Sequence, residues 1–203
     1  MHFFSPSGKS FSDSYDTATK TLTVGSNRRQ DEDQPGFDSE RNQQRRHSVT
    51  ALVRHPENRA ISDPQLTVQK GDAQHEEEIT TLVAGHNAVV SAYNAGWTNP
   101  NLYDDFLAGS QAIQRGIRKA GVKRLLVVGG AGSLEAAPGL QLVDTPQLPA
   151  GWKPGALAAR DYLNILKQET DLEWTFLSPT IRLEPGERTA RFRQNLEQPV
   201  FEE

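Results

Sequence analysis

Apolar residues are spread unevenly along the chain, and the change comes near residue 49. About a fifth of residues 1–50 are hydrophobic, whereas about two fifths of the remaining residues are. Between residues 25 and 46 the one hydrophobic residue is Phe37, in text too polar to bury apolar surface with any period. We therefore expect residues 1–45 to be an atypical, largely disordered segment and residues 46–203 to hold the folded domain. We expect no strand within residues 1–48.

From Val49 onward, short apolar runs alternate with segments of helical period. The apolar runs predict strands over 49–53, 66–69, 88–92, 124–128 and 174–177, and the helical spacing predicts helices over 76–84, 102–120 and 156–169. Continuous apolar strands that alternate with helices are typical of a parallel sheet covered on both faces. The predicted fold class is therefore α/β, with a Rossmann-like, doubly wound parallel sheet.

Small or polar residues follow every predicted strand. They include Arg54, Gly71-Asp72, the stretch Gly129–Ser133 and Ser178-Pro179. In parallel α/β sheets, ligands bind beyond the carboxyl ends of the strands. The pattern therefore predicts a binding crevice at this edge of the sheet.

Composition narrows the classes of function. The chain has no Cys, which excludes disulfides, thiolate metal sites and a Cys nucleophile, and the five His residues show no paired metal-ligand spacing. The net charge of −4 gives no reason to expect nucleic acid or an anionic membrane as a partner. No apolar run approaches the roughly 18 residues of a membrane helix, and the start does not have the pattern of a secretory signal. We expect a cytoplasmic protein with a small-molecule substrate; the oligomeric state is not predicted.

Several motifs together resemble a known family. They are Ala51-Leu-Val-Arg-His-Pro-Glu57, Lys70-Gly-Asp72, Val127-Val-Gly-Gly-Ala-Gly-Ser-Leu-Glu135, Gly139-Leu-Gln-Leu-Val-Asp-Thr-Pro146 and Leu177-Ser-Pro179. They resemble the atypical short-chain dehydrogenase group, whose members are described as NAD(P)H-binding proteins or NADH-flavin reductases and have biliverdin-IXβ/flavin reductase as a distant relative. The resemblance covers about residues 46–192 and implies an NAD(P)-linked oxidoreductase.

The chain departs from the family pattern in two places. The family begins with a strand and a Gly-rich turn, G-x-x-G-x-x-G, whose backbone N–H groups meet the cofactor pyrophosphate. Gly25 and Gly36 lie too far apart to form that turn. The family also continues beyond about residue 193. The expected domain therefore lacks a recognisable first βα unit and the C-terminal elements, through a shifted reading frame or through divergence. We expect exposed strand edges and marginal stability to follow.

The resemblance gives cofactor roles to residues at the strand ends. Arg54 would hold the 2′-phosphate of NADP, which makes NADPH the expected cofactor and NAD the less favoured one. Asp72 would approach the adenine edge. A solvated Arg and an ordinary Gly-Asp turn are the plain alternatives.

The other expected site residues follow the later strands. Ser133 is the candidate catalytic residue, which would hydrogen-bond a substrate carbonyl or the nicotinamide amide, and the glycines beside it would allow close backbone approach. Trp97 and Trp152, in predicted loops, would cover a planar substrate or only pack. Simple strand and turn endings are the alternative for the remaining expected cofactor-binding residues, which are Ser91, Ala92, Tyr93, Gly129, Gly130, Ser178 and Pro179.

The sequence contains no Tyr followed four residues later by Lys, the usual dyad of short-chain dehydrogenases. Hydride transfer would then rest on positioning, as suits acceptors that need little acid catalysis. The favoured function is NAD(P)H-dependent reduction of a flavin, quinone or similar planar acceptor. The alternatives are a non-catalytic NADP-binding regulator and a defective product of a shifted or truncated frame.

Overall fold

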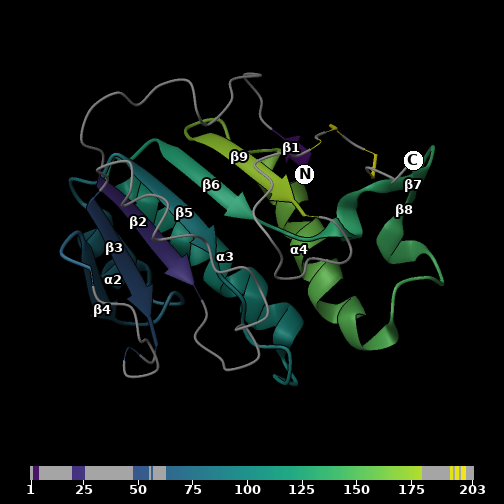
Figure 1. Ribbon diagram of the computed structural model, residues 1–203, viewed down its shortest axis with the longest axis horizontal. Helices are drawn as coiled ribbons and strands as arrows, with labels where there is room; N and C mark the ends of the chain where they lie inside the picture. Colours follow the sequence, from purple (N-terminus) through teal and green to yellow (C-terminus); the bar gives the residue numbers. More distant parts are fainter. Residues whose placement is uncertain are drawn as a thin grey trace.

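A computed structural model describes residues 2–4, 20–25, 48–54, 56, 63–179, 193, 195, 196, 198 and 199. Seven strands form one sheet in the order β1-β9-β6-β5-β2-β3-β4. These strands are β1 (His2–Phe4), β2 (Lys20–Gly25), β3 (Ser48–Val53), β4 (Leu66–Lys70), β5 (Ala88–Ala92), β6 (Arg124–Val128) and β9 (Glu173–Ser178). All neighbouring strands are parallel except β1, which pairs antiparallel with β9 at the edge (Figure 1). The described part of the chain is thus the predicted Rossmann-like α/β sheet.

Three described α-helices pack on one face of this sheet, with α3 between the other two (Figure 1). They are α2 (Glu76–Val83), α3 (Leu102–Lys119) and α4 (Lys153–Leu166). On α3, Phe106, Ile113 and Ile117 share one helical face and are buried against the strands. Burying an aliphatic or Phe side chain of this size stabilises the fold by roughly 1.5–3 kcal/mol. The long period-3.6 pattern in the sequence is therefore the pattern of the core.

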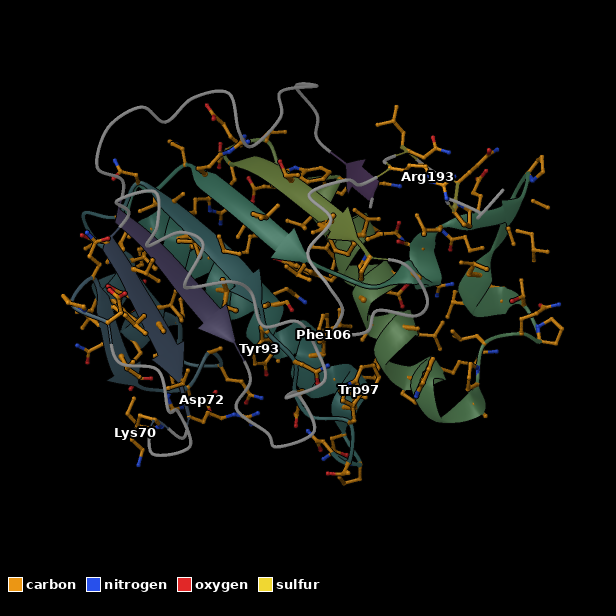
Figure 2. All side chains as sticks on the ribbon, in the orientation of Figure 1. Lys70, Asp72, Tyr93, Trp97, Phe106 and Arg193 are labelled. Carbon is orange, nitrogen blue, oxygen red and sulfur yellow. The ribbon has the colours of Figure 1, made fainter. Side chains whose placement is uncertain are left out.

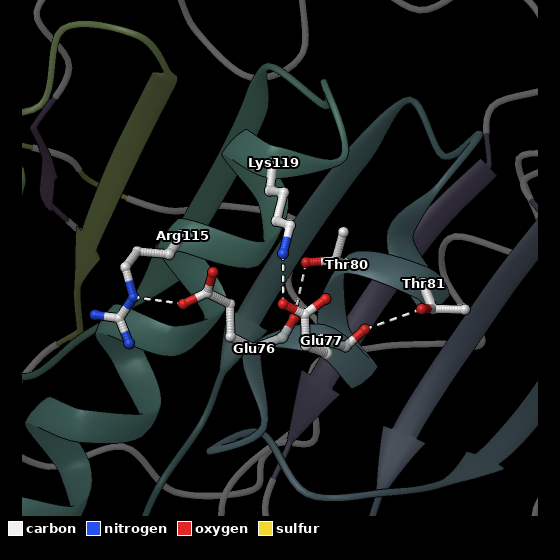
Figure 3. Close-up of polar contacts among 6 residues, drawn as sticks. All are labelled: Glu76, Glu77, Thr80, Thr81, Arg115 and Lys119. Carbon is white, nitrogen blue, oxygen red and sulfur yellow. Dashed lines mark hydrogen bonds and ion pairs between the residues drawn. The ribbon is translucent and has the colours of Figure 1, made fainter.

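Ion pairs fasten α2 to α3 at the surface (Figure 3). Arg115 Nε donates to Glu76 Oε2 at 2.7 Å, and Lys119 Nζ donates to Glu77 Oε1. Beneath them, a Cβ added to Gly116 would lie 2.6 Å from Ile79 Cγ2, so the glycine lets the two helices approach closely. The contact between α2 and α3 is therefore apolar in its buried part and charged at the surface.

The expectation that residues 1–48 contain no strand is wrong for two short stretches. β2 lies in the middle of the sheet, parallel to both β3 and β5, with Leu22 opposite Thr50 and Val89. Because this strand pairs on both sides, the exposed edges that we expected beside Val49 do not occur there. The remainder of residues 1–45, for which disorder is predicted, lies outside the described residues.

Between β6 and α4 the chain forms a small substructure that the sequence did not predict. It contains three 3₁₀ turns, η3 (Ala131–Ser133), η4 (Leu142–Asp144) and η5 (Ala150–Trp152), and a hairpin of β7 (Glu135–Ala137) and β8 (Leu140–Gln141). The backbone N–H of Leu142 donates to Leu134 O at 2.8 Å, which ties the far end of the hairpin to its beginning. This substructure follows directly from the carboxyl end of β6, so it shapes one wall of the edge where a ligand is expected.

Candidate functional site

The carboxyl ends of the parallel strands meet at one edge of the sheet. Gly25 at the end of β2 pairs with Ala92 at the end of β5. From this pair, β3 and β4 extend to one side, and β6 and β9 extend to the other. The strand order therefore reverses between β2 and β5, and such a switch point is where open α/β sheets bind ligands.

The side of the switch point that carries β3 and β4 presents charged side chains; we call it the charged side. Arg54 and Asp72 are both half-buried, and Figure 2 shows Asp72 near Tyr93 at this edge of the sheet. Burial raises the pKa of Tyr93, the hydrogen bond from Gln74 opposes that shift, the carboxylate of Asp72 adds to it and the charge of Arg54 opposes it. The structure thus places the predicted Arg54 and Asp72 within electrostatic reach of the predicted Tyr93.

Asp72 is held in a tight turn. Its Oδ1 accepts a hydrogen bond from the backbone N–H of Gln74 at 3.0 Å. Its own backbone N–H donates to Glu78 Oε2 at 3.0 Å, on the first turns of α2. Gly71-Asp72 therefore begins a turn, as the plain alternative expects. A contact of Asp72 with adenine stays a prediction.

Tyr93 is packed into the protein. Its hydroxyl donates to the backbone oxygen of Asp105 at 3.2 Å and accepts from Gln74 Nε2 at 3.5 Å. A Cβ added to Gly109 would lie 2.5 Å from the ring, and the ring centroid of Phe106 is 6.0 Å away. Tyr93 therefore packs beneath the carboxyl edge of the sheet and stabilises it. Ser91 is also buried, while Ala92 is half-buried.

On the other side of the switch point, the residues that end or directly follow β6 and β9 are uncharged and include two buried hydroxyls; we call this the neutral side. Ser133 Oγ and Ser178 Oγ lie 3.3 Å apart, and Ser133 Oγ also lies 3.5 Å from the backbone oxygen of Gly130. Ser133 is 6% exposed and Ser178 is fully buried. The structure thus joins two predicted site residues whose contact was not predicted. Pro179, the next residue, is half-buried at the end of β9.

The glycines of the stretch 129–133 have different surroundings. A Cβ on Gly129 would lie 2.0 Å from the ring of Phe176, and one on Gly132 would lie 3.0 Å from Ala156 Cβ. At Gly130 the nearest atom would be Ala159 Cβ, at 3.9 Å. Packing alone therefore explains Gly129 and Gly132. Gly130 is the glycine beside which there is space for a ligand.

Sequence reasoning missed Gln141 as a residue of this site. Its Nε2 donates to the backbone oxygen of Ser133 at 3.3 Å, so β8 helps to fix η3. Gln141 lies within the family-like run from Gly139 to Pro146, which was the available signal. Among the residues that the structure describes, no group of three His, Asp or Glu side chains is placed to hold a metal ion.

A family model of NAD(P)H-binding proteins matches residues 40–201. The chain belongs to this NAD(P)H-binding family. It is 32% identical to the uncharacterised protein YwnB of Bacillus subtilis over 154 residues, which are 74% of this chain and 68% of that protein. The resemblance to NAD(P)H-binding proteins seen in the sequence is confirmed, and a nicotinamide dinucleotide is the ligand of the family.

Solved structures agree with this assignment. A protein of Bacteroides thetaiotaomicron, provisionally classed as an epimerase, is 36% identical with a TM-score of 0.78 over 91% of this chain and 81% of its own. A protein of Streptococcus pneumoniae, provisionally classed as an NADH-flavin reductase, is 29% identical with a TM-score of 0.68 over 92% of this chain and 84% of its own. The likeness therefore extends across nearly the whole chain.

The described residues are compatible with a dinucleotide that lies across the switch point, except that they include no Gly-rich turn for its pyrophosphate. A cationic side chain stands at the end of β3, and a buried, uncharged wall follows β6 and β9. The strand that normally leads into the pyrophosphate turn is present as β2. After Gly25, however, the next glycine in the sequence is Gly36, and residues 26–47 lie outside the described residues.

None of the helices in the described part of the chain combines the length and the apolar character that a membrane crossing demands.

Proposed function

We propose that this protein is an NAD(P)H-dependent oxidoreductase that reduces a flavin, quinone or similar planar acceptor. The proposal rests on one observation in this member of the NAD(P)H-binding family. On one side of the switch point the side chains are charged, and on the other side the residues form an uncharged, buried wall. The first side suits the phosphorylated ribose and adenine of a dinucleotide. The second suits an uncharged nicotinamide ring and a planar acceptor.

On the charged side, Arg54 binds the 2′-phosphate and so favours NADPH over NADH. Asp72 approaches the adenine. The backbone and side chains at the end of β5 line the floor near the ribose; they are Ser91, Ala92, Tyr93 and Asn94. The burial of Tyr93 and Ser91 supports a role through backbone and shape.

On the neutral side, Gly130 lets the ligand approach the backbone, next to Gly129. Ser133 orients the substrate or the nicotinamide amide, while Ser178 fixes the Ser133 hydroxyl from behind, and Pro179 borders the nicotinamide. When bound, a dihydronicotinamide would supply a hydride, and a flavin or quinone acceptor would also need one proton, which water can provide. The chain then needs to position two rings and exclude side reactions, which agrees with the absence of the Tyr-x-x-x-Lys dyad.

The relatives point to two reaction classes. The classification of the Streptococcus pneumoniae protein supports a flavin acceptor. The classification of the Bacteroides thetaiotaomicron protein would require a group that removes and returns a proton at a substrate carbon. The described neutral side holds hydroxyls without a general base among their hydrogen-bond partners, which favours the reductase.

A steady-state assay of NADPH oxidation with FMN, menadione and benzoquinone tests the proposal, alongside equilibrium binding of NADPH. We expect acceptor-dependent oxidation that exceeds the rate without protein. NADPH binding without turnover of any acceptor would contradict it and would favour the second candidate, a non-catalytic NADP-responsive regulator. The engagement of the Ser133 hydroxyl by protein partners is the observation that favours that candidate.

A further inference from the structure

Trp97 lies on the loop between β5 and α3, which hydrogen bonds hold in place. Asn94 Oδ1 accepts from the backbone N–H of Gly96 at 2.6 Å, and Gly96 adopts the left-handed backbone with φ of 104°. Asn99 donates its backbone N–H to Gly96 O at 2.9 Å and its Nδ2 to Asp105 Oδ2 at 2.7 Å. The loop is fixed at both ends, yet the indole that it carries remains 39% exposed. An indole that is held in place but only partly covered offers a flat apolar face on which a ring can stack.

The position of Trp97 joins it to the neutral side of the site. A Cβ on Gly155, in the first turn of α4, would lie 2.9 Å from Trp97 Cζ3. The next residue, Ala156, is the neighbour of Gly132 described above. Adjacent Cα atoms are about 3.8 Å apart, so Trp97 and Gly132 contact neighbouring points of the same helical turn. Figure 2 shows Trp97 beside the ribbon of α4.

We propose that the exposed face of Trp97 is the platform on which the planar electron acceptor stacks. This inference rests on the proposed function and names the acceptor subsite, at the border of the stretch Gly129–Ser133. Conjugated rings such as isoalloxazine or a quinone offer a large face, and aromatic stacking adds to the area that they bury. One edge of the indole rests on Gly155, so the ring is oriented before the ligand arrives and loses little freedom on binding.

The test measures binding of FMN alone, by quenching of flavin fluorescence, and then the KM for FMN in NADPH oxidation. Trp97→Ala is expected to raise the dissociation constant of FMN roughly tenfold, and Trp97→Phe to retain most of the affinity. Thr98→Ala is the matched control, because Thr98 is the exposed neighbour of Trp97 on the same loop and the substitution keeps the indole. Its FMN affinity should stay within about twofold of the parent protein.

Gly155→Ala gives a second variant that keeps the indole but displaces it, because the added Cβ would meet the ring edge at 2.9 Å. It should weaken FMN as well, and it guards against a Trp97→Ala protein that does not fold. Unchanged FMN affinity in both Trp97→Ala and Gly155→Ala would overturn this inference while leaving the reductase intact. Binding of FMN that depends on Trp97, without NADPH oxidation, would contradict the proposed function and keep the platform. No FMN binding by the parent protein would contradict both.

Discussion

The two sides of the switch point differ in charge, burial and support. The side of β3 and β4 presents Arg54 and Asp72, both half-buried, and the helix next to it, α2, is tied to α3 by ion pairs. The side of β6 and β9 presents two buried serines and close glycine contacts, and α4 beneath it packs through fully buried Leu163 and Leu166. We therefore expect the first side to recognise a ligand by charge and the second by shape. Each prediction below tests whether that division holds.

The largest effect concerns the stretch between the two sides, where β2 ends. This chain is expected to bind NADPH weakly, because no Gly-rich turn follows Gly25 in the sequence. A chimera in which residues 26–47 are exchanged for the Gly-rich turn and first helix of the family should bind roughly a hundredfold tighter or better. The reason is that a pyrophosphate gains several charge-assisted hydrogen bonds of about 1.5–3 kcal/mol each. Calorimetric titration measures both proteins.

Micromolar or tighter binding of NADPH by the unaltered chain would show that residues 26–47 supply a phosphate site of another kind. The coding DNA gives an independent check. Because β2 and β3 are neighbours in the sheet, a shifted frame that removed the Gly-rich turn between them would lie within residues 26–47. A Gly-rich turn in another frame of that stretch alone would support this reading.

The charged side is tested by Arg54→Ala. Removing a charge-assisted contact of about 1.5–3 kcal/mol should weaken NADPH roughly tenfold to a hundredfold and leave NADH nearly unchanged. The measurement is the ratio of the two dissociation constants, in the chain and in the chimera. Lys70→Ala is the control, since it removes an exposed cation from the end of the neighbouring β4. Equal losses for both cofactors would remove Arg54 from the phosphate site.

The neutral side is tested by two neighbouring glycines. Gly129→Ala should lower the free energy of unfolding by about 1–3 kcal/mol, because its Cβ would meet the fully buried Phe176. Gly130→Ala should leave stability nearly unchanged, as its backbone is extended and its surroundings are open. It should instead weaken ligand binding. Urea unfolding compares the two, and similar destabilisation by both would contradict the division of roles.

Ser133→Ala tests whether the buried hydroxyl contributes to turnover. Loss of one neutral hydrogen bond of about 0.5–1.5 kcal/mol should lower kcat roughly twofold to tenfold, with a smaller change in NADPH affinity. Ser110→Ala is the control, because Ser110 is a buried serine on α3 outside the Ser133–Ser178 pair. If kcat is unchanged with every acceptor, the stretch Gly129–Ser133 is a plain turn.

Most of the folded part was predictable because its apolar periods are long. The helix predicted over 102–120 is observed as Leu102–Lys119, and the strand predicted over 88–92 has those same bounds. α4 begins three residues before its predicted start, since Pro154 was assigned to a loop although Pro is favoured in a first helical turn. β2 was missed because it has only Leu22 and Val24 among threonines, in polar surroundings. Thr is itself a good strand former, and that was the neglected signal.

The positions of the site residues were predictable, and their surroundings were not. A residue at the end of a strand can be placed at the edge of the sheet from the sequence alone. Whether its side chain faces a ligand depends on partners that are distant in sequence. Phe176 explains Gly129, and Asp105 and Gly109 explain the burial of Tyr93. Gln141 was missed for the same reason. Its hydrogen bond to Ser133 depends on the β7–β8 hairpin, which the hydrophobic pattern of the sequence does not predict.

The smallest effect concerns the helix under the charged side. The hydrogen bond from Arg115 lowers the pKa of Glu76 below its ordinary value. A carboxyl whose pKa is lower in the folded protein contributes stability above its unfolded pKa, and this contribution is lost as the pH falls through the folded pKa. Glu76→Gln should therefore destabilise slightly at neutral pH and not at all in acid, and added salt should shrink the difference. Leu163→Ala, beneath the neutral side, should cost about 2–5 kcal/mol with little dependence on pH or salt, because its contact is apolar. Urea unfolding at several pH values compares the variants. A Glu76→Gln effect that persists unchanged in acid would show that Glu76 stabilises the contact through packing and not through its charge.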